Sequence, residues 1–99
     1  MATRKRRTTR NVFGDLGLPP EEAEHLKIRS NLMIELTKLI RIRGLTQARA
    51  AKLFDVSQPR VSDLMRGKID RFSIDTLVEM LGHAGAHVSL RVRRWSQVA

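Results

Sequence analysis

The side chains in this sequence with the clearest chemical potential lie close together, between Ser57 and Asp63. Gln58 and Arg60 can each form two coplanar hydrogen bonds, and Ser62 offers a hydroxyl group. A glutamine amide pairs in this way with the major-groove edge of adenine, and an arginine guanidinium pairs with that of guanine. Hydroxyl groups, and the free N–H groups at the start of a helix, suit phosphate oxygens. These residue types at this spacing indicate a surface that reads double-stranded DNA.

Two sets of DNA contacts are predicted. The residues expected to face bases are Gln58, Pro59, Arg60, Ser62 and Asp63. The residues expected to hold phosphates are Thr46, Gln47, Arg49, Ser57, Arg66 and Lys68. Within the first set, Pro59 can contact a thymine methyl group. Phosphates repel the charge of Asp63, so it is expected either to accept a hydrogen bond from cytosine or to orient Arg60 or Arg66.

A pair of short helices joined by a tight turn is predicted to position these side chains, over residues 46–66. Thr46 and Ser57 each precede an apolar repeat and are expected to cap the two helices, because a hydroxyl oxygen can accept from a free N–H in the first turn. Pro59 fits the first turn of the second helix, where its missing N–H leaves no hydrogen bond unmade. Gly67 is expected to end that helix. The second helix should therefore expose its polar face to solvent.

Two more helices are predicted around this pair. Pro19 and Pro20, followed by acidic residues, mark the start of a long helix that should reach about Arg43, with apolar side chains at three- and four-residue spacing on one face. Ser73 is expected to cap a further helix that runs to about Leu81. The predicted fold class is therefore a mainly α, four- to five-helix domain.

The chain after residue 85 changes to a period of two. Apolar residues at 86, 88, 90 and 92 alternate with polar or basic residues, which predicts a short C-terminal β-strand with one apolar face. A lone strand cannot satisfy its own backbone N–H and C=O groups. We therefore expect this strand to be used in pairing, with residues 11–18, with a second copy of the chain or with another protein.

Composition and charge indicate how the chain is organised. The 99 residues are expected to form a single domain over residues 11–94, followed by a tail at 95–99. Residues 1–10 contain five Arg or Lys residues and no apolar periodicity, which predicts a basic disordered arm. That arm is either a solubilising tail or a clamp that orders on DNA. The formal net charge of +9 favours a polyanionic partner.

The composition also argues against several classes of protein. The sequence has no cysteine and three scattered histidines, so neither a disulfide nor a metal site is expected. It has no glycine-rich phosphate loop and no serine–histidine–aspartate arrangement, so we expect no catalytic residues, no cofactor and no enzyme activity. No apolar run approaches the roughly 20 residues that span a membrane. A cytoplasmic protein is therefore expected.

The helix pair resembles the Cro/cI-type (XRE) helix-turn-helix family. The matching residues are Leu45-Thr46-Gln47, Ala51, Leu53-Phe54, Val56-Ser57, Gln58 and Val61-Ser62. The resemblance implies that Gln47 contacts a phosphate. It implies base contacts for Gln58, Pro59, and Ser62 or Asp63. Asp55 departs from the family pattern, which usually has glycine in the turn. Because aspartate tolerates the left-handed conformation at modest cost, the turn is still expected to form.

Nearly the whole chain resembles HigA-type antitoxins of type II toxin–antitoxin operons. The segments that carry this likeness are NVFGDLGL at 11–18, the long helix, RGK at 66–68, FSIDTLVEMLGHAG at 72–85 and VSLRVR at 88–93. The resemblance implies a dimeric repressor of its own operon that also binds and neutralises a RelE/HigB-like ribonuclease toxin.

The sequence favours binding to a palindromic operator by a homodimer that represses transcription by occlusion, as the antitoxin of a toxin–antitoxin operon. A stand-alone phage-type or chromosomal regulator is the alternative. An adaptor whose basic charge faces RNA or an acidic protein is a third hypothesis. Equal affinity for random and cognate duplexes would argue against specific repression.

Overall fold

The computed structural model describes residues 17–94 of the chain. Within this range four α-helices and one short 3-10 helix follow one another, in the order α2 (Pro20–Ile42), α3 (Gln47–Phe54), α4 (Gln58–Met65), η2 (Ile69–Arg71) and α5 (Ile74–His83). The mainly helical fold class is confirmed for this part of the chain. The predicted arm at residues 1–10 and the tail at 95–99 lie outside the described residues.

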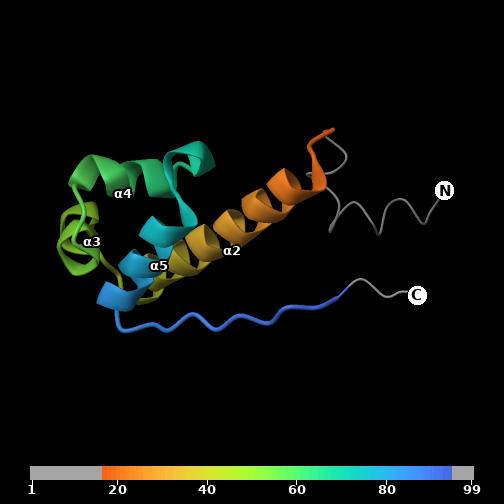
Figure 1. Ribbon diagram of the computed structural model, residues 1–99. Helices are drawn as coiled ribbons and strands as arrows, with labels where there is room; N and C mark the ends of the chain where they lie inside the picture. Colours follow the sequence, from red (N-terminus) through yellow and green to blue (C-terminus); the bar gives the residue numbers. More distant parts are fainter. Residues whose placement is uncertain (1–16, 95–99) are drawn as a thin grey trace, which may run out of the picture.

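Helix α2 is the longest element, at 23 residues. Pro20 occupies its first turn together with Glu21 and Glu22, which suit the positive end of the helix dipole. Its buried face is formed by Met33, Leu36 and Ile40. In Figure 1 the first turns of α2 extend beyond the other helices, and the later turns lie beside them. No helix in residues 17–94 is both long enough and apolar enough to cross a membrane.

Helices α3 and α4 are joined by a tight turn, as predicted. The Thr46 hydroxyl accepts a hydrogen bond from the backbone N–H of Arg49 at 3.1 Å, and the Ser57 hydroxyl accepts one from that of Arg60 at 3.3 Å. These two predicted caps are therefore confirmed, as is the third, since the Ser73 hydroxyl accepts from the N–H of Thr76 at the start of α5. Between the helices, Asp55 adopts the left-handed conformation with φ 60° and ψ 49°. An aspartate thus sustains the turn in which the family pattern usually has glycine.

Asp55 is the only non-glycine residue with positive φ in residues 17–94. This conformation costs an L-residue free energy that glycine avoids. Replacing Asp55 by glycine is expected to raise the free energy of unfolding by about 0.5–1 kcal/mol, measured by urea denaturation. Asp55→Ala is the matched control, since it keeps the Cβ atom but loses the short polar side chain, and it is expected to destabilise. If the glycine variant is no more stable than the alanine variant, the left-handed conformation of Asp55 does not carry the expected free-energy cost.

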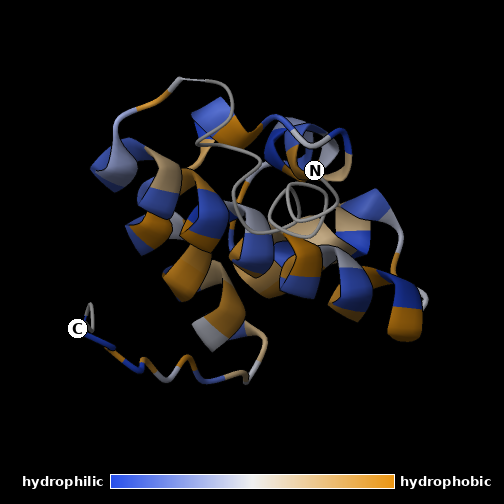
Figure 2. Cartoon of the chain, turned by 90° about the vertical axis from the view of Figure 1, so that its right-hand side faces the viewer, coloured by the Kyte–Doolittle hydropathy of each residue, from blue (hydrophilic) through white to orange (hydrophobic). Residues whose placement is uncertain are grey.

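One hydrophobic core holds the described helices together. Its most deeply buried large side chains are Leu36, Phe54, Val61, Leu64, Phe72, Leu77 and Met80. They come from all four α-helices of the described part and from the residue after η2, so the core joins α4 to the remaining helices. Figure 2 shows hydrophobic and hydrophilic residues alternating along the helices, as amphipathic helices require.

The predicted C-terminal β-strand is wrong for the part of the chain that the structure describes, because residues 86–94 form no strand there. The N–H of Ala86 donates to the carbonyl of Leu81 at 2.9 Å, which closes the end of α5. Beyond that bond the chain runs as an extended segment (Figure 1). Alternation predicts the two faces of a strand, but a strand also needs a partner backbone, and no strand is found anywhere in residues 17–94.

The extended segment leaves its apolar side chains in solvent. The exposed fractions of Val88, Leu90 and Val92 are 36%, 82% and 90%. One predicted pairing partner, the segment 11–18, lies almost wholly outside the described residues. The other predicted partners are separate chains, so pairing of this segment stays a prediction.

Candidate nucleic-acid interface

Helix α4 turns one face to the core and the opposite face to solvent. Val61 and Leu64 are buried, at 0% and 1% exposure. At about 100° per residue around a helix, the opposite face is centred on Pro59 and Arg66, and the half-buried Ser62 and Asp63 lie on either side of it. Gln58 is exposed at the first position of the helix. In Figure 1, α4 runs along an outer edge of the molecule, so this outer face is open to a partner.

The predicted phosphate contacts lie at the N-terminal ends of α3 and α4 and after the C-terminal end of α4. The exposed candidates at the N-terminal ends are Thr46, Gln47, Arg49 and Ser57. Both hydroxyl oxygens already accept a backbone hydrogen bond as caps, which leaves each O–H able to donate to a phosphate. After α4, Arg66 is exposed, whereas Lys68 is half-buried.

Arg60 lies on the flank of α4 and not on its outer face. Its Nη1 donates a hydrogen bond to the carbonyl oxygen of Arg71 at 2.9 Å. Its guanidinium carbon stands 5.1 Å from the centre of the Phe72 ring, within the range of a cation–π contact. The side chain is half-buried. The structure therefore does not bring Arg60 together with Gln58 and Pro59, which were predicted to face bases beside it.

Asp63 pairs with an arginine outside its own helix. Arg71 Nη1 lies 3.2 Å from Asp63 Oδ2, and the two side chains are 51% and 18% exposed, respectively. The partner thus differs from the expected Arg60 or Arg66. The chain turns at Gly67, where φ is 70°, before η2 brings Arg71 to the flank of α4. A pair eight residues apart matches none of the three- and four-residue spacings that join side chains on one helix.

Two arginines in or next to α2, neither of them predicted as a site residue, also bind backbone carbonyls. Arg29 Nη1 donates to the carbonyls of Ile69 at 3.2 Å and Phe72 at 3.5 Å. Arg43 Nη2 donates to that of Ala84 at 3.2 Å. These bonds tie the segments after α4 and α5 to the α2 region. Because every residue carries a carbonyl, no spacing of side-chain types predicts them.

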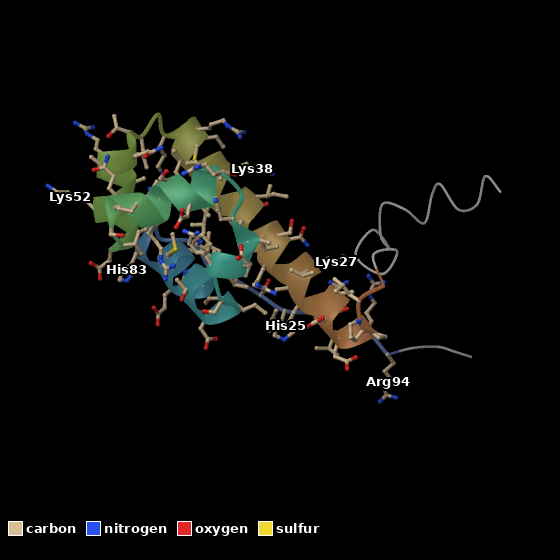
Figure 3. The ribbon with its side chains drawn as sticks, turned by 90° about the horizontal axis from the view of Figure 1, so that it is seen from above. His25, Lys27, Lys38, Lys52, His83 and Arg94 are labelled. Carbon is tan, nitrogen blue, oxygen red and sulfur yellow. The ribbon has the colours of Figure 1, made fainter. Side chains whose placement is uncertain are left out.

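A hollow of about 610 Å³ lies between α2, α4, η2 and the start of α5. The charged and imidazole side chains in its lining are His25, Arg29, Arg60, Asp70, Arg71 and Asp75. In residues 17–94 no group of three or more His, Cys, Asp or Glu side chains could hold a metal ion. Figure 3 shows Lys27, Lys38 and Lys52 at separate places along α2 and α3. The lysines labelled there form no single basic patch.

The arrangement of α3 and α4 defines a class of protein. Two short helices meet through a tight turn, and the second exposes a polar face, which is the layout of a helix-turn-helix. A family model described as "Helix-turn-helix domain" matches residues 12–93. The chain belongs to this family.

Among solved structures, the chain is similar to one described as "Putative XRE Family Transcriptional Regulator", with a TM-score of 0.71 and 30% sequence identity. The match covers 79% of this chain and 90% of that one. No match is found among curated proteins. The XRE-type part of the predicted resemblance is therefore confirmed, whereas the likeness to HigA-type antitoxins stays a prediction.

Proposed function

We propose that this protein is a sequence-specific regulator of transcription that binds double-stranded DNA through α4. The observation that supports this most directly is the exposed polar face of α4. Ser57 caps the start of this helix, and Val61 and Leu64 on its opposite face are buried in the core. A helix of this kind can enter the major groove with its N-terminal residues beside base edges. The net charge of +9 favours attachment to the phosphate backbone.

The proposed contacts follow from residue type and from side chains that are exposed or, at Ser62 and Lys68, half-buried. Gln58 pairs with adenine, Pro59 contacts a thymine methyl group, and Ser62 contacts a base edge or a phosphate. The residues proposed to hold phosphates are Thr46, Gln47, Arg49, Ser57, Arg66 and Lys68. Base contact by Arg60 or Asp63 requires that they leave the partners described above.

Selection from a library of random duplexes tests this function. The expected result is one recurring palindromic sequence, bound about 10³-fold or more tightly than random duplex at physiological salt. The logarithm of the binding constant should fall linearly with the logarithm of salt concentration, because binding releases counterions from DNA. Equal affinity for selected and random duplexes would rule out sequence-specific regulation and favour an adaptor whose basic charge faces RNA or an acidic protein.

A palindrome is expected because we propose that two copies of the chain bind together and repress transcription by occlusion. After Ala86, which packs against the core, the alternating apolar residues Val88, Leu90 and Val92 are 36%, 82% and 90% exposed. Two such segments can pack against each other, which would cover part of these side chains. Binding of both copies to one palindrome requires their two α4 helices to enter successive major grooves about 34 Å apart.

Replacing Leu90 and Val92 together by serine is expected to weaken the dimer, because the paired segments would lose their apolar contact. Sedimentation should show a shift toward monomer, and affinity for the palindrome should fall about tenfold or more, which corresponds to about 1.4 kcal/mol. The control changes His87 and Ser89, on the other face of the segment, to alanine and should leave the dimer intact. A dimer that survives the serine changes would place the interface elsewhere.

We further propose that the regulator is an antitoxin that controls its own operon. The resemblance to HigA-type antitoxins supports this, as do two features beyond a minimal DNA reader. These are the first turns of α2, which extend beyond the other helices (Figure 1), and the exposed segment 86–94. The test is co-expression with a RelE/HigB-like reading frame adjacent to the gene, which this chain should render harmless. Absence of rescue would favour a stand-alone phage-type or chromosomal regulator.

A further inference from the structure

Three polar side chains from α2 and α4 converge on the segment 69–72, which contains η2. Arg29, from α2, donates to two carbonyls of this segment. Arg60, from α4, donates to the carbonyl of Arg71 at 2.9 Å. Asp63, also from α4, accepts from Nη1 of Arg71 at 3.2 Å. Together Arg29, Arg60, Asp63 and residues 69–72 form a unit that we call the η2 clamp.

The η2 clamp grips α4 on one flank. Arg60 and Asp63 are three positions apart and therefore lie on the same side of the helix. The core holds the inner face of the same helix through Val61 and Leu64. Because two sides are fixed by different neighbours, α4 cannot roll about its axis without breaking contacts on one of them. The rotation of α4 about its own axis determines which of its side chains point into a DNA groove.

The position of Arg60 is defined by a rigid neighbour. Phe72 is 2% exposed, so its ring is a fixed surface beneath the guanidinium, whose carbon lies 5.1 Å from the ring centre. The hydrogen bond to the carbonyl oxygen of Arg71 holds the guanidinium in the same position. An arginine that reads guanine directs its paired donors at the base edge. Arg60 would have to lose both of its present contacts to do so.

The pairing of Asp63 accounts for an acidic residue beside a DNA-binding face. A carboxylate repels phosphates, but a cation 3.2 Å away cancels most of its charge as felt at the DNA backbone. Asp63 is 18% exposed, whereas Arg71 is 51% exposed. The member of the pair that solvent and DNA can reach more easily is therefore the cation.

We propose that Arg60 and Asp63 are positioning residues, which orient α4 for base reading through the η2 clamp and contact no base themselves. The proposal rests on the proposed DNA-binding function and deepens it. A positioning role and direct base contact predict different effects of mutation. Loss of either residue disturbs the whole reading face, whereas loss of a base-contacting residue disturbs recognition of one base pair.

NMR on the full chain tests the clamp without DNA. Side-chain protons of Arg60 should show ring-current shifts from Phe72, and its guanidinium N–H protons should exchange more slowly than those of an exposed arginine. Arg49 is the internal control, because it is exposed at the start of α3. Shifts and exchange rates for Arg60 that match those of Arg49 would overturn the proposal.

A second measurement uses the operator selected from random duplexes, together with a panel in which each base pair is changed in turn. Arg60→Met and Asp63→Asn are each expected to lower operator affinity about five- to twentyfold and to reduce discrimination at several base pairs together. Arg71→Gln should reproduce the effect of Asp63→Asn, although Arg71 lies outside α4. The combined Asp63→Asn and Arg71→Gln variant should be no weaker than the weaker single variant. Circular dichroism confirms that each variant is folded at the assay temperature.

The possible failures are distinguishable. Loss of preference at a single base pair in Arg60→Met or Asp63→Asn, with Arg71→Gln unaffected, would demonstrate direct base contact. That result would overturn the positioning role and leave the DNA-binding function intact. Failure of the unaltered protein to select any sequence would overturn the proposed function, and the inference with it.

Discussion

Replacing Leu64 by alanine is expected to lower the free energy of unfolding by about 2–5 kcal/mol. Leu64 is 1% exposed on the inner face of α4, so the change removes apolar contacts from the core and leaves a cavity. Small domains have only about 5–15 kcal/mol of stability in total. The variant should therefore unfold at much lower urea concentration than the unaltered protein, as measured by circular dichroism.

Met65 offers the matched control, because it is the next residue of the same helix and is 39% exposed. Met65→Ala is expected to cost less than about 1 kcal/mol. Operator DNA should partly restore the stability of Leu64→Ala, since a ligand that binds only the folded state shifts the equilibrium toward it. Equal losses from the two changes would contradict the orientation of α4 in the structure.

Replacing Gln58 by alanine is expected to weaken binding to the selected operator by about 1–3 kcal/mol. Gln58 is exposed at the first position of α4, and the N-terminal residues of a reading helix face base edges. The change removes a bidentate pair with adenine, so the preference at one A·T pair should relax while the others persist. Fluorescence anisotropy with the operator, and with duplexes changed at each pair, measures both effects.

Gln47 is a control of the same residue type. It begins α3 as Gln58 begins α4, and it is proposed to hold a phosphate. Gln47→Ala should weaken binding to all duplexes alike and leave the base preference unchanged. Unchanged operator affinity in Gln58→Ala, or an altered base preference in Gln47→Ala, would show that the reading face is assigned wrongly.

The helix-turn-helix could be predicted from the sequence because its signals are local. The caps at Thr46 and Ser57 join residues only three apart, and the turn is closed by the left-handed Asp55 and by the N–H of Val56, which donates to the carbonyl of Ala51. The exposed positions of Gln58 and Pro59 follow from the same local pattern, since burial of every third or fourth residue fixes the opposite face.

The partners of the charged residues on α4 could not be predicted in this way. Arg60 and Asp63 are close in sequence to the residues proposed to read bases, and arginine and aspartate side chains can both bind base edges. Their observed partners, Arg71 and Phe72, reach them because the chain turns after α4 and returns along its flank. No periodicity within a helix describes such a return.

By itself, the sequence determined the four α-helices of residues 17–94, the turn between α3 and α4, and which face of α4 is polar, because apolar periodicity and capping act within a few residues. Only the tertiary structure decided which polar side chains on α4 are held by η2, and that residues 86–94 form no strand within the described part of the chain. Both outcomes depend on which distant segments fold beside one another, since a guanidinium needs a nearby acceptor and a strand needs a neighbouring backbone.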